Sequence, residues 1–485
     1  MHVLNPLDIP YMGPYYPSYA PEWSSGGIYG LHYHKGALLY TVAFDALTII
    51  YHKGRVKEYR YELIGEPPRS GGDTYGAAAG VDDTLFFGGW VHAPAHYDVA
   101  KRKITFHHKY SHLHRVDLRD MEVSLMYKDG PGLEDSWSAE VSDILYNPVE
   151  DSLILFRGDG HFGHGVYTLD REGRRVVRLS STPVLRGTFF LDQLIAGVFC
   201  PPGFTVPAPS LQIFDMENKE ARITRYDTVA SADGSPPEGK SIVALSPLRN
   251  KLYAFVDDGI FVGDPTGTYN WNPDSVFIRL FATGEGVARY SLCRRVKAVN
   301  FGGGLLVPVT KSDIENSPTP AASASGILLF IDDSYTKIIH ASGRITGLAA
   351  TPDSILLATA SSENTQTSTR IDYCFKQILK LPHDIINRNP PPISLTVAKQ
   401  IVNNEQLGGI PLTGYLKKRA VITLSSDNRM IIREYDLSTP QDGADTERYM
   451  LKKGRNEISL DGFGRIVSFK FEKNDKTGSL YLYLA

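Results

Sequence analysis

Cysteine is almost absent from this sequence, because its 485 residues contain only three: Cys200, Cys293 and Cys374. Their number is odd, their spacings are wide and no Cys-x-x-Cys pair occurs, which argues against a disulfide scaffold and an all-cysteine zinc site. Such scarcity fits a reducing compartment, so we expect a cytoplasmic protein.

Long apolar runs and an excess of charge are missing as well. No stretch reaches the roughly 18 apolar residues that cross a bilayer, and residues 1–6 lack the basic and apolar regions of a secretory leader. We therefore expect neither a membrane-spanning segment nor a leader. The formal net charge is −3 and the sequence pI is about 6.5, which argues against binding of duplex nucleic acid by electrostatics alone.

Helical periodicity is also scarce. No stretch of about twelve residues repeats apolar side chains at i, i+3, i+4 and i+7. Short runs rich in Val, Ile, Tyr, Phe and Thr occur instead, separated by Gly, Pro, Asp-Gly and Asn, for example in residues 37–44, 152–156, 251–256 and 326–331. This pattern predicts an almost all-β protein.

The short runs recur in a fixed order. A strand rich in small residues is followed by a strongly apolar strand, then by a strand that often ends in Asp, then by a polar strand. Such units begin near residues 28, 75, 139, 189, 241, 296 and 345, a spacing of about 50 residues that is typical of propeller blades. We predict a seven-bladed β-propeller over residues 24–386; one or two β-sandwiches are the alternative.

Two segments lie outside the repeat. Residues 1–23 hold five prolines and four tyrosines after residue 4, which predicts an extended N-terminal segment that packs through its aromatic rings. Residues 387–485 contain further strand patterns and predict a small C-terminal β-module. A second interpretation is that one or more of these strands complete the first blade and close the ring.

Segments 71–76 (GGDTYG) and 83–96 (DTLFFGGWVHAPAH) resemble an uncharacterised family of proteins from thermophilic archaea that is grouped with β-propellers. The resemblance covers under a tenth of the chain. It implies the propeller fold and an archaeal, thermophilic source, and it implies no ligand or catalytic residue, because the family has no assigned activity. Few cysteines and seven methionines also fit a thermophilic source.

One face of the predicted propeller carries long loops. The loops between second and third strands lie on the same face as the connections between blades, and loops gathered on a rigid scaffold commonly carry function. We call this the long-loop face; its loops span residues 88–102, 157–164, 199–209, 310–325 and 360–370.

Polar and aromatic residues are expected near this face and around the central funnel. They suit a sugar, a nucleotide or a peptide carboxylate, through stacking and bidentate hydrogen bonds. Lining a water-filled channel is the alternative role. The candidate ligand-binding residues are Asp73, Trp90, Asp135, Trp137, Arg186, Arg294 and Arg295.

Histidine is concentrated between residues 92 and 164, where eight of the 14 histidines lie. Neutral imidazoles beside a carboxylate suit Zn²⁺ or another divalent transition metal. Imidazoles bonded to backbone groups in glycine-rich turns are the alternative. On the strand around residue 112, at most His112 and His114 point to the same side. The candidate metal ligands are His92, His96, Asp159, His161 and His164.

The function favoured by the sequence is binding or scaffolding of a protein or small polar ligand on the long-loop face. No Gly-x-Ser-x-Gly elbow and no P-loop occurs, so whether the chain is an enzyme stays open. A metal-dependent hydrolase or lactonase using the histidine set is the first alternative. The second is an RNA-associated protein that binds through Lys417, Lys418, Arg419, Lys452, Lys453 and Arg455.

Overall fold

The computed structural model of the protein describes residues 2–3, 13–14, 28–42, 47–64, 76–92, 95–98, 103–106, 108–132, 136–201, 209–218, 220–226, 240–263, 276–284, 289–293, 295–312, 325–333, 335–360, 375–400, 402, 404–437 and 444–485. Strands predominate within these ranges, and the one helical element among them is the short 3-10 helix η2 (His383–Asn387). No helix in the described part of the chain has the length and apolar character needed to cross a membrane. The predicted all-β architecture is confirmed.

Between residues 28 and 382 the described strands form seven successive antiparallel sheets, and a short hairpin follows the second strand of the second sheet. In chain order the sheets are β3 (Ile28–His34), β4 (Ala37–Val42), β5 (Leu47–His52), β6 (Arg55–Tyr59); β7 (Ala77–Val81), β8 (Thr84–His92), β11 (Lys109–Asp117), β12 (Glu122–Gly132); β13 (Val141–Asn147), β14 (Ser152–Arg157), β15 (Gly165–Asp170), β16 (Val176–Ser180); β17 (Val184–Phe190), β18 (Gln193–Val198), β19 (Ser210–Asp215), β20 (Glu220–Arg225); β21 (Ala244–Leu248), β22 (Lys251–Val256), β23 (Gly259–Gly263), β24 (Val276–Arg279); β25 (Arg289–Leu292), β26 (Val299–Phe301), β27 (Gly304–Ser312), β28 (Gly326–Ile331), β29 (Thr336–Ser342); and β30 (Arg344–Ala350), β31 (Ser354–Ala360), β32 (Phe375–Pro382), the hairpin being β9 (Ala95–Asp98) and β10 (Lys103–Phe106).

In the first four sheets burial decreases from the second strand to the fourth. Every residue of β4, β14 and β31 is buried, and these strands carry the apolar runs of the sequence. The fourth strands β6 and β20 carry charged residues; β20 is largely exposed, and β6 is exposed at its first two residues. Sheets that stand radially produce this gradient, because neighbouring sheets cover both faces near the axis while the rim meets water.

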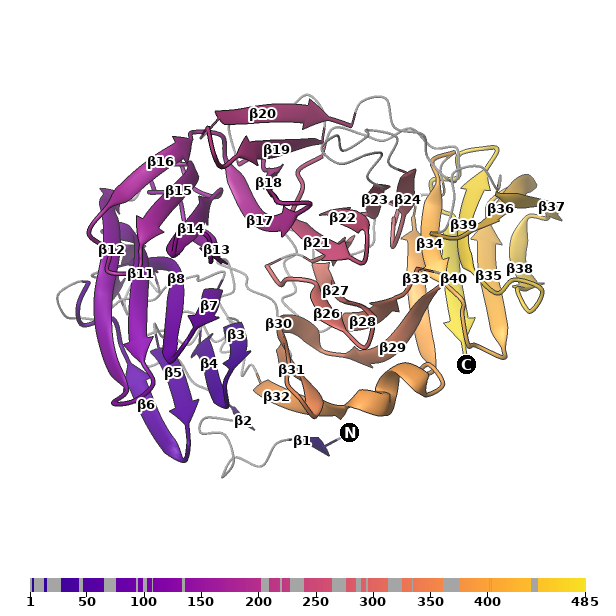
Figure 1. Ribbon diagram of the computed structural model, residues 1–485. Helices are drawn as coiled ribbons and strands as arrows, with labels where there is room; N and C mark the ends of the chain where they lie inside the picture. The colour runs from indigo at the N-terminus through magenta and orange to yellow at the C-terminus, as the bar shows by residue number, and fades with distance from the viewer. Residues whose placement is uncertain are drawn as a thin grey trace.

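The innermost strands close into a ring (Figure 1). Each contacts the next in the order β3, β7, β13, β17, β21, β26 and β30, and β30 contacts β3 again. Gly30 and Gly76 allow the approach between β3 and β7, because both have positive φ and a Cβ on Gly76 would lie 2.0 Å from the backbone nitrogen of Gly30. The arrangement is that of a β-propeller.

The last sheet of the ring receives its outer strands from the beginning of the chain. β1 (His2–Val3) and β2 (Gly13–Pro14) both pair antiparallel with β32. The described strands of the C-terminal region, in contrast, pair with one another. Among the described residues, ring closure by strand pairing therefore uses the N-terminal segment.

Two four-stranded sheets form the C-terminal region beside the ring (Figure 1). An apolar core continues from β22–β24 and β27–β29 into these sheets, so the two parts of the molecule share buried surface. The Tyr435 hydroxyl donates to the carbonyl of Arg279 at 2.8 Å, and the Ala282 N–H donates to the carbonyl of Gly408 at 2.8 Å. The first sheet consists of β33 (Ile393–Lys399), β40 (Ser479–Leu484), β35 (Lys418–Leu424) and β38 (Gly454–Ser459), and the second of β34 (Leu407–Pro411), β39 (Ile466–Phe471), β36 (Asn428–Tyr435) and β37 (Asp445–Leu451).

Candidate functional site

The candidate ligand-binding residues fall into two separate places. Trp90 and Trp137 lie in one aromatic cluster, while Arg186 and Arg295 line a cavity at the centre of the ring. The remaining candidates, Asp73, Asp135 and Arg294, lie outside the described residues.

The tryptophan cluster encloses a cation of the chain itself. The indole rings of Trp90 and Trp137 lie 6.1 Å apart, and the Lys109 Nζ lies 3.1 Å from the first ring centroid and 4.0 Å from the second. The Trp90 Nε1–H donates to the carbonyl of Ser138 at 2.7 Å. Because Trp90 and Lys109 are buried, this cation–π arrangement stabilises the second sheet, and ligand binding by the two tryptophans stays a prediction.

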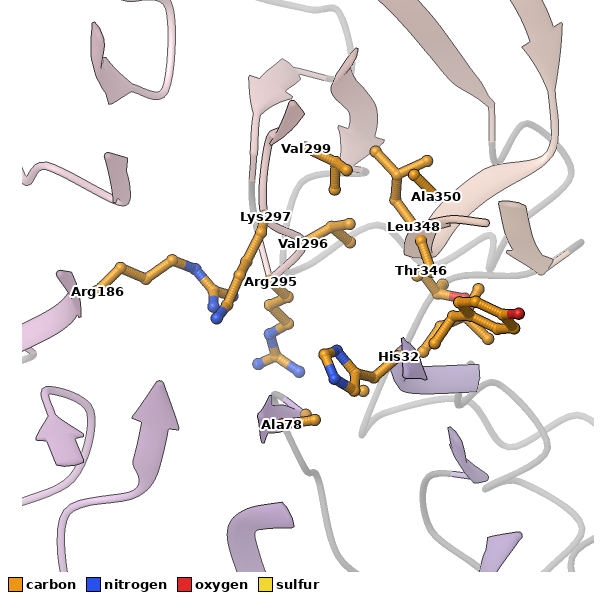
Figure 2. Close-up of a pocket in the computed structure, with 16 residues that line it drawn as sticks. His32, Ala78, Arg186, Arg295, Val296, Lys297, Val299, Thr346, Leu348 and Ala350 are labelled. Carbon is orange, nitrogen blue, oxygen red and sulfur yellow. The ribbon is translucent and has the colours of Figure 1, made fainter. Parts of the chain in front are cut away.

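The central cavity has a volume of about 220 Å³ and lies where β3, β7, β17, β30 and the segment leading into β26 meet (Figure 2). Three cationic side chains, Arg186, Arg295 and Lys297, turn their ends toward it. Small residues in the first strands, such as Gly30, Ala78 and Gly347, leave this space open. This explains why the first strand of each repeat in the sequence is rich in small residues.

Asp143 on β13 holds two of these cations. Its carboxylate forms an ion pair with the Lys297 Nζ, and its Oδ1 lies 4.0 Å from the Arg186 Nη1. Arg186 also donates to the carbonyl of Ser142 at 3.3 Å. Arg186 and Asp143 are both almost completely buried, so these charges sit in a medium where attraction to an anion is strong.

Two uncharged polar side chains complete the cavity. Burial, together with the positive charge of Lys297 and the nearby His34, lowers the pKa of His32 to about 4, so its imidazole is neutral at neutral pH. Among the described residues, neither the His32 Nε2 nor the buried Thr346 Oγ1 has a hydrogen-bond partner. Both residues line the cavity.

The histidine set is only partly described. His92 pairs with Lys109 in the β8–β11 ladder and His96 with Thr105 in the β9–β10 hairpin, and the side chains of both lie outside the described residues. His164 Nε2 donates to the carbonyl of Gly160 at 2.9 Å. No group of three or more His, Cys, Asp or Glu side chains within the described ranges is placed to hold a metal ion.

The loop that carries His161 packs against the connector to its own sheet. The Trp137 N–H donates to the His161 Nδ1 at 2.9 Å, and the two rings stack with centroids 5.6 Å apart. The Asp159 Oδ1 accepts a hydrogen bond from the Gly160 N–H. These contacts are internal to the loop and its connector, so the metal site stays a prediction.

His112 and His114 point together, as the strand pattern predicts. Their Nδ1 atoms lie 3.1 Å apart, and the Tyr59 hydroxyl lies 2.7 Å from the His114 Nε2. Both imidazoles are completely buried between the first two sheets, away from solvent.

The basic residues of the C-terminal sheets contact groups of those same sheets. Lys418 is buried and bonds the carbonyl of Phe463. The Arg419 Nη1 lies 2.7 Å from Glu457, and the Lys452 Nζ lies 3.1 Å from Asp427. These contacts leave RNA binding a prediction.

Asp143, Lys297, His32 and Thr346 were not among the candidates drawn from the sequence. The sequence did contain a feature that could have indicated them: each is a polar residue that interrupts a run of small or apolar residues at or near a first strand. Sequence alone does not show which of these interruptions face the axis.

Solved structures resemble the chain at low identity. The β-propeller domain of the Trilobed protease from Pyrococcus furiosus is 12% identical, with a TM-score of 0.38 over 73% of this chain and 93% of that one. PorZ, a surface component of the type-IX secretion system of Porphyromonas gingivalis, is 11% identical, with a TM-score of 0.45 over 98% of this chain and 60% of that one. A puromycin-hydrolysing peptidase of Mycobacterium tuberculosis is 10% identical, with a TM-score of 0.41 over 80% of this chain and 58% of that one.

Among curated proteins, none matches the sequence. A family model does match, over residues 38–368, and its description is "Uncharacterized protein conserved in archaea (DUF2139)". The match covers most of the ring and includes both segments on which the resemblance to an archaeal family depended. The chain therefore belongs to this archaeal family.

Proposed function

We propose that the chain is a seven-bladed β-propeller that binds a small anionic ligand in its central cavity. The observation that carries the proposal is the convergence of Arg186, Arg295 and Lys297 on one cavity (Figure 2). Each of the seven sheets is taken as one blade, residues 24–386 as the propeller and residues 387–485 as an attached β-module. Strands β1 and β2 supply the outer strands of the last blade.

The charge balance of the cavity favours an anion. Arg186 and Lys297 share the single negative charge of Asp143. A buried cation is costly unless a partner compensates it, and a bound carboxylate or phosphate supplies that compensation through charge-assisted hydrogen bonds. His32 and Thr346, which carry polar atoms without a partner among the described residues, add two uncharged polar side chains to the lining of the cavity.

Titration calorimetry on the full chain tests the proposal, with inorganic phosphate and small carboxylates as probes. Replacing Arg295→Gln should weaken binding by roughly 10- to 100-fold, since a hydrogen bond to a charged group contributes about 1.5–3 kcal/mol. Arg174→Gln is the matched control, because that side chain is exposed in a turn at the outer edge of its sheet. Equal affinity in both variants, or no binding of any of these anions at millimolar concentration, would contradict the proposal.

A further inference from the structure

The central cavity has two chemically different ends. Arg186, Arg295, Lys297 and His32 gather at one end, and Val299, Leu348 and Ala350 lie at the other (Figure 2). Val296 and Leu348 are buried members of one hydrophobic cluster, and Val299 packs against that cluster. A ligand that fills the cavity therefore meets cations on one side and hydrocarbon on the other.

We propose that the ligand is a small monocarboxylate with an apolar tail, an inference that rests on the proposed function. The carboxylate lies among the cations, where the planar guanidinium of Arg295 suits a two-oxygen anion. The tail extends toward Val299 and Leu348. A ligand charged at both ends is disfavoured, because the apolar end has no described charged side chain to replace the hydration of a second anionic group.

The volume limits the size of the ligand. The cavity of about 220 Å³ would hold roughly seven waters at about 30 Å³ each. This corresponds to a short acid of about four to seven carbon atoms and is smaller than the usual cavity for a nucleotide or a drug-sized molecule. Two of the lining residues pack tightly, since a Cβ on Gly347 would lie 2.8 Å from the Leu31 Cβ.

A chain-length series tests the inference. Calorimetric titration of the full chain with acetate, butanoate and hexanoate should show affinity rising about fourfold for each added methylene, the equivalent of about 0.8 kcal/mol. The rise should stop once the cavity is full, so decanoate should bind no more tightly than hexanoate. Inorganic phosphate should bind more weakly than hexanoate.

A variant at the apolar end separates this inference from a general anion site. Val299→Thr keeps the side-chain shape but adds a hydroxyl, and it should weaken hexanoate binding several-fold more than acetate binding. Val149→Thr, on a side chain that is 91% exposed, is the matched control. Affinity that is independent of chain length, or phosphate that binds more tightly than hexanoate, overturns the inference but leaves the proposed function standing. Absence of binding by every anion overturns both, and the series on the unaltered protein gives its answer even if the variant fails to fold.

Discussion

Removing one buried histidine should make the fold less sensitive to acid. His112 and His114 are completely buried between the first two sheets. Burial lowers the pKa of His112 from 6.5 to about 3 and, with the nearby His112, holds that of His114 well below its ordinary value. Below pH 6.5 these two imidazoles bind protons in the unfolded chain, whereas in the folded chain they stay neutral. Stability is therefore fully retained above pH 6.5 and is lost as the pH falls from there toward 3.

The magnitude follows from proton linkage. Each histidine that stays neutral only in the folded state costs about 1.4 kcal/mol per pH unit below its unfolded pKa. Between pH 6.5 and pH 5 this amounts to about 2 kcal/mol for His112 and about 4 kcal/mol for the pair, a large share of the roughly 5–15 kcal/mol that stabilises an ordinary domain. In His112→Leu the pH-dependent loss should shrink by about 2 kcal/mol.

Urea unfolding at pH 7 and pH 5, followed by tryptophan fluorescence, measures this difference. Trp90 lies on β8, which pairs with the strand carrying His112, so the signal reports on the same region. Phe87→Leu is the matched control: the Phe87 ring stacks on His114 at 5.0 Å, and its truncation should cost about 1 kcal/mol equally at both pH values. An equal pH-dependent loss in the wild-type protein and in His112→Leu would refute the reasoning.

Three further perturbations have defined outcomes. Gly76→Ala should destabilise the ring by about 2–5 kcal/mol, because its Cβ would meet the Gly30 backbone; Gly36→Ala, with similar φ but open space, should cost only about 1–2 kcal/mol in the same denaturant titration. Asp143→Asn should lower stability by roughly 3–5 kcal/mol, and added acetate should restore more of the melting temperature than it adds to the wild-type protein; an equal acetate effect would argue against anion binding beside that residue. Deleting residues 1–14 should expose the β32 edge, lowering the calorimetric melting temperature and promoting aggregation; an unchanged transition would show that β1 and β2 contribute nothing to closure.

Several features of the fold could be read from the sequence because they depend on neighbouring residues. The apolar run at residues 152–156 predicted a buried second strand, and β14 is buried throughout. Asn147 likewise predicted a turn, and its Oδ1 accepts a hydrogen bond from the Val149 N–H at 3.1 Å in the tight connection that follows. The alternation of apolar residues and the residue types of turns are local properties. Strands and turns can therefore be predicted from them without knowledge of the partner strand.

Strand pairing between distant parts of the chain was not accessible in the same way. The sequence left open which segment closes the ring, and the C-terminal strands were one choice. β1 instead pairs with β32, more than 370 residues later. A two-residue strand carries almost no pattern of its own, and its partner is set by where the ring brings the two ends together.

The sequence by itself determined an all-β repeat in which the second strand is apolar and the fourth is polar. This could be predicted because the burial of a strand in a radial sheet decides which residue types that strand carries. The tertiary structure alone decided which polar residues share a cavity. Asp143 and Arg186 lie on the first strands of two sheets and Lys297 just before β26 of a third, and they meet only because the ring brings these segments to one axis. Electrostatic attraction falls off with distance in space rather than along the chain, so the cavity depends on the closed ring.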